Sequence, residues 1–368
     1  MTELLRKVTS FVAGAALLAV GPAAAASPGR AIQGSMHQAS VAADRPLVGT
    51  EFHGTWDVFR RGEKAELLSK LKRNGVQWVR IGIPWAMVQP RRPTAGDAGW
   101  NTSWGLPRID HAISMAHRRG LKVTGVVART PSWANGGHGP TVLPTSTHTF
   151  ARVVRFLAHR YRGQVDSWEI WNEENNDHFL QGATVGQYTR LLCAAYPAVH
   201  RGNPHAKVVY GGTSGNDWRW IKQSYRAGAK PCFDVMATHP YNGPYPPSYQ
   251  PPNDKRWWFN NIKLVRRVMA GHRDASKPVW FTEVGWSSHR NFPGMPSWMQ
   301  GVSRKQQAAY LVQMLKITAD RYPYVRRVSW YSSRNESTSN VENNHFGLFT
   351  IRLHAKPVVA ALRRYTHG

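Results

Sequence analysis

Residues 165–175 read VDSWEIWNEEN, a run of apolar and aromatic residues that ends in a cluster of polar and acidic side chains. This pattern is typical of a buried β-strand whose carboxyl end carries the polar cluster. Seven further runs rich in Val, Ile and aromatic residues occur along the chain, and helical patterns separate them. The eight predicted strands are residues 47–53, 77–83, 122–128, 165–172, 207–211, 233–239, 278–284 and 327–331.

The segments between these strands carry apolar residues at helical spacing. Residues 150–161 and 308–319, for example, each place apolar side chains on one helix face. Eight strands, each followed by a helix, predict an α/β fold with a single (β/α)8 TIM barrel, in which functional residues lie at the carboxyl ends of the strands. A doubly wound open sheet is the competing fold, but no predicted strand is followed by a glycine-rich phosphate loop of the expected form.

The N-terminal segment has the layout of a secretory signal peptide. Two basic residues precede an apolar run over residues 8–20, and the alanines at 24–26 directly precede Ser27. A membrane anchor is the alternative, but the run is shorter than a spanning helix requires. We therefore predict a signal peptide over 1–26, a flexible lead-in over 27–45 and one barrel domain over 46–368, in a protein that is secreted or associated with the cell envelope.

The chain is strongly basic, with 48 Lys and Arg against 21 Asp and Glu and a formal charge of +27. Such a charge favours encounter with anionic polysaccharides, an anionic envelope or nucleic acid, although a solvated basic surface would look the same. No zinc-ligand cysteine pairs, leucine-zipper heptads or RNP-type strand accompany the charge, so no nucleic-acid partner is expected. We expect a monomer without a membrane span.

Two cysteines, Cys193 and Cys232, are present in a chain that is predicted to reach an oxidising compartment. A disulfide between them could form and persist there. Two buried free thiols are the alternative, because the sequence does not give the separation of the two Cα atoms.

Two glutamates end predicted strands in unusual surroundings. Glu173 follows the fourth strand, and Glu283 lies near the end of the seventh strand in VWFTEVGW, residues 279–286. Strand ends meet at one face of a barrel, so the two carboxyl groups are expected to converge. Hydrolysis of a glycosidic bond needs such a pair, one group to protonate the leaving oxygen and one to attack or to activate water.

These motifs resemble the retaining glycoside hydrolases of the barrel superfamily called clan A. In those enzymes an Asn-Glu pair after strand four supplies the acid/base, and a Glu after strand seven is the nucleophile. Asn172-Glu173 and Glu283 match both motifs. The resemblance implies a secreted retaining hydrolase that cleaves O-glycosidic bonds of an extracellular or cell-envelope glycan by double displacement, without a cofactor.

The resemblance covers essentially the whole predicted barrel. It extends to Arg80 in the second strand, to His239 and Tyr241 after the sixth strand, and to Trp330 in the eighth. The closing FGLF at 346–349, with its later Lys-Pro pair, is most similar to family 39 and related family 5 enzymes. In the family the Tyr orients the nucleophile, and the His reaches toward the sugar or the acid/base.

Glu173 has two acidic neighbours that must be distinguished from it. Adjacent residues of an extended chain point in opposite directions, so Glu174 should not share the cleft with Glu283. Glu169 has the same parity as Glu173 but lies deeper, where a buried carboxylate needs a partner such as an arginine. Arg80 is expected to pair with the nucleophile, or alternatively to form a structural ion pair with Glu169.

Several other residues at predicted strand ends are candidates for contact with sugar. Trp330 is the predicted sugar platform, and Trp85, Trp133 and His53 are further candidates; each tryptophan could instead be a core residue. His239 could be a structural cleft-wall histidine, and no second His or Asp lies at metal-ligand spacing, so no metal is expected. The proline-rich stretch 244–252 is predicted to form a rigid loop on the functional face.

Two other classes of function fit parts of the sequence. A non-catalytic glycan-binding barrel would keep the cleft, although both carboxylates are present here. A basic envelope-binding or nucleic-acid-binding protein would use the charge alone. The expected substrate is a carbohydrate, with an anionic glycan favoured by the charge, and the sugar and the linkage are set by loops that vary independently of the barrel.

Overall fold

The structure is a computed structural model that describes residues 45–251 and 257–368. The predicted signal peptide at 1–26, the lead-in up to residue 44 and the end of the proline-rich stretch at residue 252 lie outside the described residues. Within the described residues no helix is both long enough and apolar enough to cross a membrane.

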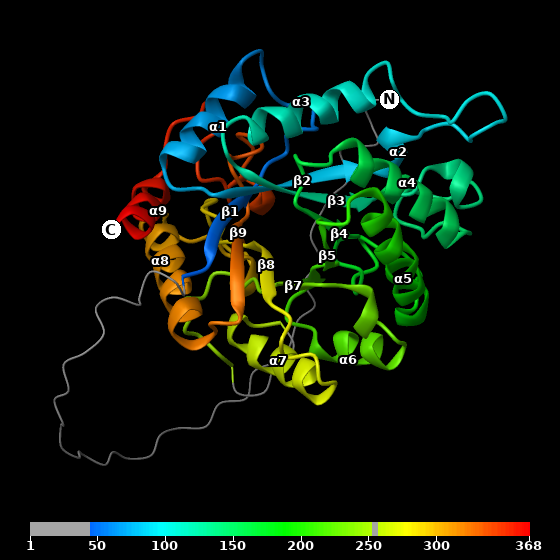
Figure 1. The fold of residues 1–368 in the computed structure, drawn as a ribbon. Coiled ribbons are helices and arrows are strands. Elements are labelled where there is room, and N and C mark those ends of the chain that lie inside the picture. The colour runs from blue at the N-terminus through cyan, green and yellow to red at the C-terminus, as the bar shows by residue number, and fades with distance from the viewer. Residues whose placement is uncertain (1–44, 252–256) are drawn as a thin grey trace. The chain divides into compact units, whose positions relative to one another are not determined.

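A single sheet of parallel strands forms the centre of the structure (Figure 1). Its order is β5-β4-β3-β2-β1-β9-β8-β7-β6. The strands of the described residues are β1 Leu47–Glu51, β2 Trp78–Pro84, β3 Lys122–Ala128, β4 Ser167–Ile170, β5 Lys207–Tyr210, β6 Thr213–Ser214, β7 Met236–His239, β8 Val279–Val284 and β9 Val325–Trp330. Each coincides with a predicted strand except β6, which continues the fifth.

The sheet curls into a barrel because its two outermost strands are pieces of one barrel strand. Only Gly211 and Gly212 separate β5 from β6, and Val209 of β5 forms a parallel bridge to Val235 before β7. Counting β5 and β6 as one strand gives the eight positions of a (β/α)8 barrel. The predicted fold class is confirmed, and the open doubly wound sheet is excluded.

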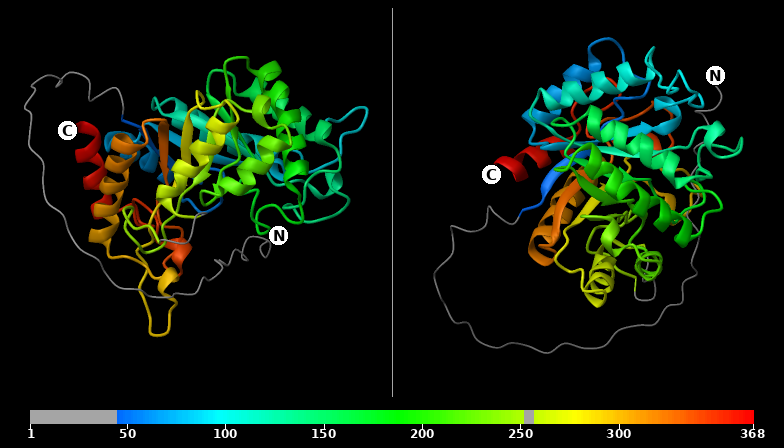
Figure 2. Two further views of the ribbon diagram at one scale, coloured as in Figure 1. Left: turned by 90° about the horizontal axis from the view of Figure 1, so that it is seen from below. Right: turned by 45° about the vertical axis from the view of Figure 1, so that its right-hand side comes forward.

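Helices surround the sheet, as the views in Figures 1 and 2 show. They are α1 Glu63–Arg73, α2 Trp85–Val88, α3 Gly105–His117, α4 Thr147–Arg160, α5 Val185–Gly202, α6 Trp218–Arg226, α7 Ile262–Gly271, α8 Arg304–Arg321 and α9 Pro357–His367. Capping boxes at Thr184 and Ser303 satisfy free backbone N–H groups at the starts of α5 and α8. The apolar face predicted for residues 150–161 is buried against the barrel.

A disulfide joins Cys193 of α5 to Cys232, in the short turn η2 (Lys230–Cys232) before β7. The two Cα atoms are 4.7 Å apart, within the range that a disulfide spans. The bridge, and not the alternative of two free thiols, is what the structure shows. It ties the helix that follows β4 to the segment that precedes β7.

The register of the strands places charged residues on the inner face of the barrel. Glu51 lies opposite Arg80, and Arg80 lies opposite Thr124. Two residues further along β3, Val126 lies opposite Glu169. Side chains alternate along a strand, so Glu51, Arg80 and Glu169 share the interior side. The barrel therefore has a charged interior just below its carboxyl-terminal face.

Candidate active site

Arg80 is the centre of this interior network, and all five of its N–H donors are hydrogen-bonded. Its Nη1 donates to Glu51 Oε2 at 2.9 Å and to Glu283 Oε1 at 2.7 Å. Its Nε and Nη2 donate to the two oxygens of Glu169 at 2.8 and 3.0 Å. The remaining Nη2 donor binds Asn172 Oδ1 at 2.7 Å. Both partners considered for Arg80, the nucleophile candidate and Glu169, are thus bound at once.

Three carboxyl groups share this one buried guanidinium. Burial alone would lower the pKa of Arg80, but the charges of Glu169, Glu51 and Glu283 raise it well above its usual value. One positive charge does not neutralise three negative ones. Burial accordingly raises the pKa of Glu51 to about 7, against the lowering effect of Arg80. Glu51 therefore accepts a hydrogen bond from Arg80 but is protonated at a higher pH than an ordinary glutamate.

Glu283 is held at both carboxylate oxygens. Oε1 accepts from Arg80, and Oε2 accepts from the Tyr241 hydroxyl at 2.8 Å. Burial would raise the pKa of Glu283, but His239, Arg80 and the Tyr241 hydrogen bond together lower it below the usual value. The structure therefore favours an ionised Glu283 with a fixed orientation.

Glu173 reaches the same space through an unusual backbone turn. Trp171 and Glu173 have φ angles of 77° and 47°, in the left-handed region that side chains larger than glycine rarely adopt. The backbone N–H of Glu173 donates to Gly212 O at 3.0 Å, which holds the turn against the glycine pair of the neighbouring strand. One oxygen of Glu173 and one of Glu283 lie within 4.8 Å of each other.

The turn changes the reason for preferring Glu173 over Glu174, because the chain after β4 is not extended there. Glu174 is buried beside Tyr188 and Tyr210, and burial raises its pKa well above the usual value. Its Oε2 lies next to Gly211, outside the cluster formed by Glu173 and Glu283. The prediction of Glu173 agrees with this geometry, but the expectation that the chain is extended at residues 173 and 174 was wrong.

His239 connects the acid/base candidate to the Arg80 network. Its Nδ1 lies 2.9 Å from Glu173 Oε1, and its Nε2 lies 3.1 Å from Thr282 Oγ1. The Thr282 hydroxyl donates to Glu169 Oε1 at 3.1 Å, which leaves its oxygen free to accept from His239. Burial would lower the pKa of His239, but the charges of Glu283 and Glu173 raise it. His239 is therefore part of the charged network. It is not only a structural histidine of the cleft wall, which was the alternative.

Glu173, His239 and Glu283 also offer three ligand atoms within 4.8 Å of one another, close enough to hold a metal ion. Sequence spacing does not predict this triplet, because its members come from three separate strands. The set fits a resident metal poorly, however, since both nitrogens of His239 and both oxygens of Glu283 already have hydrogen-bond partners. The neighbouring Arg80 guanidinium would also repel a cation.

Two of the predicted sugar-contacting tryptophans lie in the core. Trp330 is 0% exposed, and its Nε1 donates to Phe346 O at 2.9 Å. Trp85 is also fully buried and packs edge-on against Trp133 and Phe150. The prediction of Trp330 as a sugar platform was wrong, because its ring points away from the barrel interior. Trp133 is half-buried after β3, and its Nε1 donates to a backbone oxygen.

The next residue, Tyr331, takes the position that was expected of Trp330. Its ring is partly exposed and stands edge-on to Tyr241 at 6.4 Å and to His53 at 5.8 Å. Its hydroxyl donates to Glu336 Oε1 at 3.0 Å. Both aromatic residues end the eighth predicted strand, and the structure distinguishes the ring that faces Tyr241 from the one in the core.

His53 lies at the end of β1, as predicted, and has two partners that the sequence did not indicate. Its ring stacks on Trp56 at 3.8 Å, and its Nδ1 lies 3.5 Å from Glu336 Oε1. Burial lowers the pKa of His53 to about 4, so the ring is neutral near pH 7. Burial also raises the pKa of Glu336 to about 7. Trp56 is 39% exposed, which makes it the open aromatic face of this wall.

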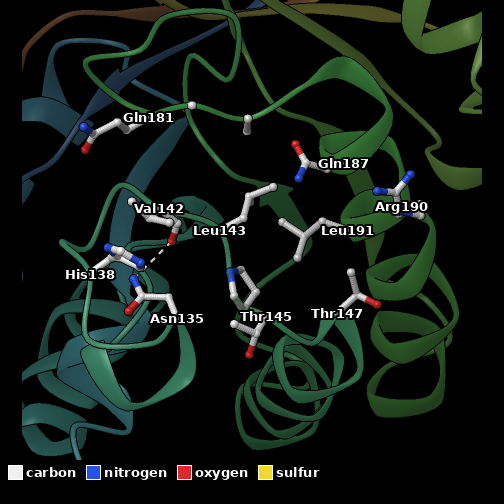
Figure 3. A pocket seen from close by; sticks show the side chains of 13 residues that line it. Asn135, His138, Val142, Leu143, Thr145, Thr147, Gln181, Gln187, Arg190 and Leu191 are labelled. Atoms are coloured by element: carbon white, nitrogen blue, oxygen red, sulfur yellow. Dashed lines mark hydrogen bonds between the residues drawn. The ribbon is translucent and has the colours of Figure 1, made fainter.

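A pocket of about 370 Å³ lies among the loops that follow β3 and β4 and the helices α4 and α5 (Figure 3). The backbone N–H of Gln181 donates to Thr141 O at 3.0 Å and joins the two loops. Polar side chains on its wall include Asn135, His138, Gln187 and Arg190. The pocket does not contain the two glutamates, but it is built on the loop that carries Glu173.

A closed parallel barrel with two carboxyl groups converging at its carboxyl-terminal face defines the class of barrel glycoside hydrolases. The family described as Cellulase (glycosyl hydrolase family 5) matches residues 39–322. The chain belongs to this family of glycoside hydrolases. No curated protein matches the sequence at a significant level.

Solved structures share this fold at low sequence identity. A family 39 glycoside hydrolase from Bacteroides cellulosilyticus WH2 is 21% identical with a TM-score of 0.68, over 88% of this chain and 64% of that one. A family 39 β-xylosidase from Caulobacter crescentus is 18% identical with a TM-score of 0.62, over 88% and 71%. A GH5_18 protein from Bifidobacterium longum subsp. longum, in complex with Manβ1-4GlcNAc, is 15% identical with a TM-score of 0.66, over 88% and 78%.

These likenesses confirm the predicted resemblance to clan A enzymes of families 39 and 5. The chain spans less than two thirds of the length of the Bacteroides structure. The reaction stereochemistry, the individual roles of the site residues and the substrate are treated below as proposals.

Proposed function

We propose that this chain is a secreted retaining glycosidase in which Glu283 is the nucleophile and Glu173 the acid/base. The observation that carries the proposal is the approach of their oxygens to within 4.8 Å. Retaining enzymes place the two carboxyl groups about 5–5.5 Å apart, whereas inverting enzymes place them about 6.5–9.5 Å apart to admit a water. The short separation supports direct attack by a carboxylate.

In the first step, Glu283 attacks the anomeric carbon and forms a glycosyl ester. The bond from that carbon to the leaving oxygen breaks, and Glu173 transfers its proton to this oxygen. Arg80 and Tyr241 support the nucleophile, because they favour its ionised form and leave it one orientation. Glu173 becomes a carboxylate beside His239.

In the second step, water attacks the anomeric carbon of the ester. Glu173 accepts a proton from this water, and Glu283 departs as a carboxylate. Before the first step, a protonated Glu173 can donate to His239 Nδ1 while Nε2–H donates to Thr282. After proton transfer, the charge on Glu173 favours a proton on Nδ1 instead. His239 thus acts as a positioning residue that suits both forms of the acid/base.

The sugar that becomes attached to Glu283 would lie against Tyr331. This ring is beside Tyr241, which binds the nucleophile, and its partner Glu336 offers an acceptor for sugar hydroxyls. His53 and the exposed face of Trp56 extend the same wall. An aromatic face with polar groups at its edge is the usual form of a sugar contact.

The proposed substrate is an extracellular or cell-envelope glycan, with an anionic one favoured by the charge of +27. Export rests on the predicted signal peptide at 1–26. The chain is proposed to act as a monomer without nucleic acid, and the domain from residue 46 to 368 would hold the whole catalytic site.

A trapping experiment tests the mechanism. A 2-deoxy-2-fluoro glycoside with an activated leaving group should form a stable adduct with a retaining enzyme, because the fluorine slows both steps while the activated leaving group accelerates only the first. A panel of such sugars, analysed by intact-protein and peptide mass spectrometry, should label the peptide that contains Glu283, and Glu283→Gln should abolish labelling. Inverted configuration of the first product, observed by NMR, would contradict the proposal.

A further inference from the structure

Arg129 directly follows β3 at the carboxyl-terminal face and has a φ of 68°. This left-handed conformation is costly for a residue other than glycine, and such conformations concentrate at functional sites. The backbone is held in place, since the Arg129 carbonyl accepts from Ala86 N–H at 2.9 Å and the next N–H, of Thr130, donates to Pro140 O. The side chain is therefore aimed by a constrained turn.

The guanidinium of Arg129 is half-buried without a counter-charge. Its Cζ lies 5.9 Å from the centre of the Phe179 ring. Across residues 45–251 and 257–368, the structure gives this guanidinium neither a hydrogen bond nor an ion pair. Four other arginines, Arg80, Arg160, Arg327 and Arg334, each bind a carboxylate. Burial lowers the pKa of Arg129, and no acidic group opposes this effect.

The place of Arg129 in the barrel relates it to one side of the cleft. Strand β3 is the neighbour of β4, and Phe179 belongs to the loop that follows β4 and carries Glu173. Glu283 comes from β8, which is separated from β3 by three other strands. If Glu173 protonates the leaving oxygen, Arg129 lies on the side of the leaving group.

We propose that Arg129 is a specificity-determining residue that binds the carboxylate of an acidic sugar on the leaving-group side. The inference rests on the proposed function, because that function defines this side. A guanidinium and a carboxylate form two parallel hydrogen bonds, and such a ligand would supply the charge that the chain does not. A pocket of about 370 Å³ lies on the same two loops (Figure 3).

Binding measurements test this proposal without requiring turnover. Oligosaccharides of hyaluronan and polygalacturonate would be titrated into the Glu283→Gln variant by calorimetry, together with the same oligosaccharides after reduction of their carboxylates to alcohols. Adding Arg129→Gln should weaken binding of at least one acidic probe about tenfold, equivalent to about 1.4 kcal/mol. Its effect on the reduced probe should be less than about twofold.

Two further variants separate a specific contact from general charge and from misfolding. Arg155→Gln removes one exposed positive charge on α4 and should have little effect. Arg129→Lys keeps the charge but not the planar fork, so it should bind the acidic probe with intermediate affinity. Equal losses for the acidic and reduced probes, or an equal loss in the Arg155 variant, would overturn the assignment to a carboxylate.

Hydrolysis of aryl glycosides by the wild type is a separate readout, because their leaving group carries no sugar. Arg155→Gln, the exposed control on α4, should leave this activity unchanged. If the wild type hydrolyses no aryl glycoside, the proposed function is contradicted. Failure of Glu283→Gln to bind any acidic probe, in an enzyme that does hydrolyse aryl glycosides, would overturn the inference about Arg129 alone.

Discussion

His239 Nδ1 lies 2.9 Å from Glu173 Oε1 and 3.8 Å from Glu283 Oε2, so one imidazole stands between the two carboxyl groups. Through Thr282 and Glu169 the same histidine is connected to Arg80, which returns to Glu283. The hydrogen bonds therefore form a continuous chain that joins Glu173 to Glu283 through His239, Thr282, Glu169 and Arg80. A change at either glutamate is expected to alter the protonation of the other.

Glu283→Gln should reduce turnover by about three orders of magnitude or more, because an amide cannot form the glycosyl ester. Binding of glycan should persist, since the amide oxygen can still accept from Arg80. Steady-state kinetics on aryl glycosides and calorimetric titration with a bound oligosaccharide would measure the two effects. Glu66→Gln, an exposed change on α1, is the control, and undiminished hydrolysis by Glu283→Gln would exclude the nucleophile role.

Glu173→Ala should impair substrates with poor leaving groups by about a further hundredfold relative to activated aryl glycosides, which need little protonation. The measurement is the dependence of kcat/KM on the pKa of the leaving group. Glu174→Gln is the matched control, because Glu174 is buried with a strongly raised pKa and its protonated acid resembles an amide. An equal loss on all substrates, or a greater loss in Glu174→Gln, would tell against the acid/base assignment.

The predicted fold was correct because it follows from local patterns. Runs of β-branched and aromatic residues end in polar clusters at 172–175 and 283, and the carboxyl ends of barrel strands meet at one face. The order of the predicted strands along the chain was therefore sufficient to predict that Glu173 and Glu283 lie close together. The fifth strand was predicted as a single run over residues 207–211. Its continuation as β6, after Gly211 and Gly212, was not predicted.

The rest of the site depends on side-chain direction and on loops. Trp330 and Tyr331 are neighbours in sequence, and only the position of the barrel axis decides which ring faces the cleft. Glu336 reaches the site from a loop after β9, where no periodic pattern exists. The left-handed turn at Glu173 has no glycine to signal it. Such features follow from tertiary contacts, which sequence spacing does not record.

Gly212→Ala should lower activity about a hundredfold, because a Cβ at this position would lie 2.1 Å from His239 Nε2. The displaced imidazole would lose its contact with Glu173, so kcat should fall more than KM rises. Gly96→Ala is the control, since no atom lies within 4 Å of an added Cβ there. Wild-type kcat in the Gly212 variant, with an unchanged pH profile, would show that His239 does not position the acid/base.

Replacing both cysteines, Cys193 and Cys232, with serine should lower the free energy of unfolding. The bridge closes a segment with a sequence separation of 39 residues, which corresponds to about 4 kcal/mol in the chain-entropy model. Urea denaturation of the double variant would measure the loss, and wild type treated with a reductant should match it. Catalysis below the unfolding transition should be unchanged, since neither cysteine contacts the glutamates, and identical midpoints for oxidised wild type and variant would contradict the prediction.

Glu51 should make stability depend on pH in a defined window. Its pKa is raised from 4.5 to about 7 by burial, so the folded state binds this proton more tightly than the unfolded state does. The resulting stabilisation is fully present below pH 4.5 and is lost as the pH rises toward 7.

Glu51→Gln keeps a hydrogen-bond acceptor for Arg80 but does not titrate. Between pH 5 and pH 8 the wild type should therefore lose stability relative to Glu51→Gln, by on the order of 1–3 kcal/mol in urea denaturation. A constant difference across this range, like that expected for the exposed Glu66→Gln, would mean that Glu51 is ionised in the folded protein throughout and that Arg80 holds three charged carboxylates.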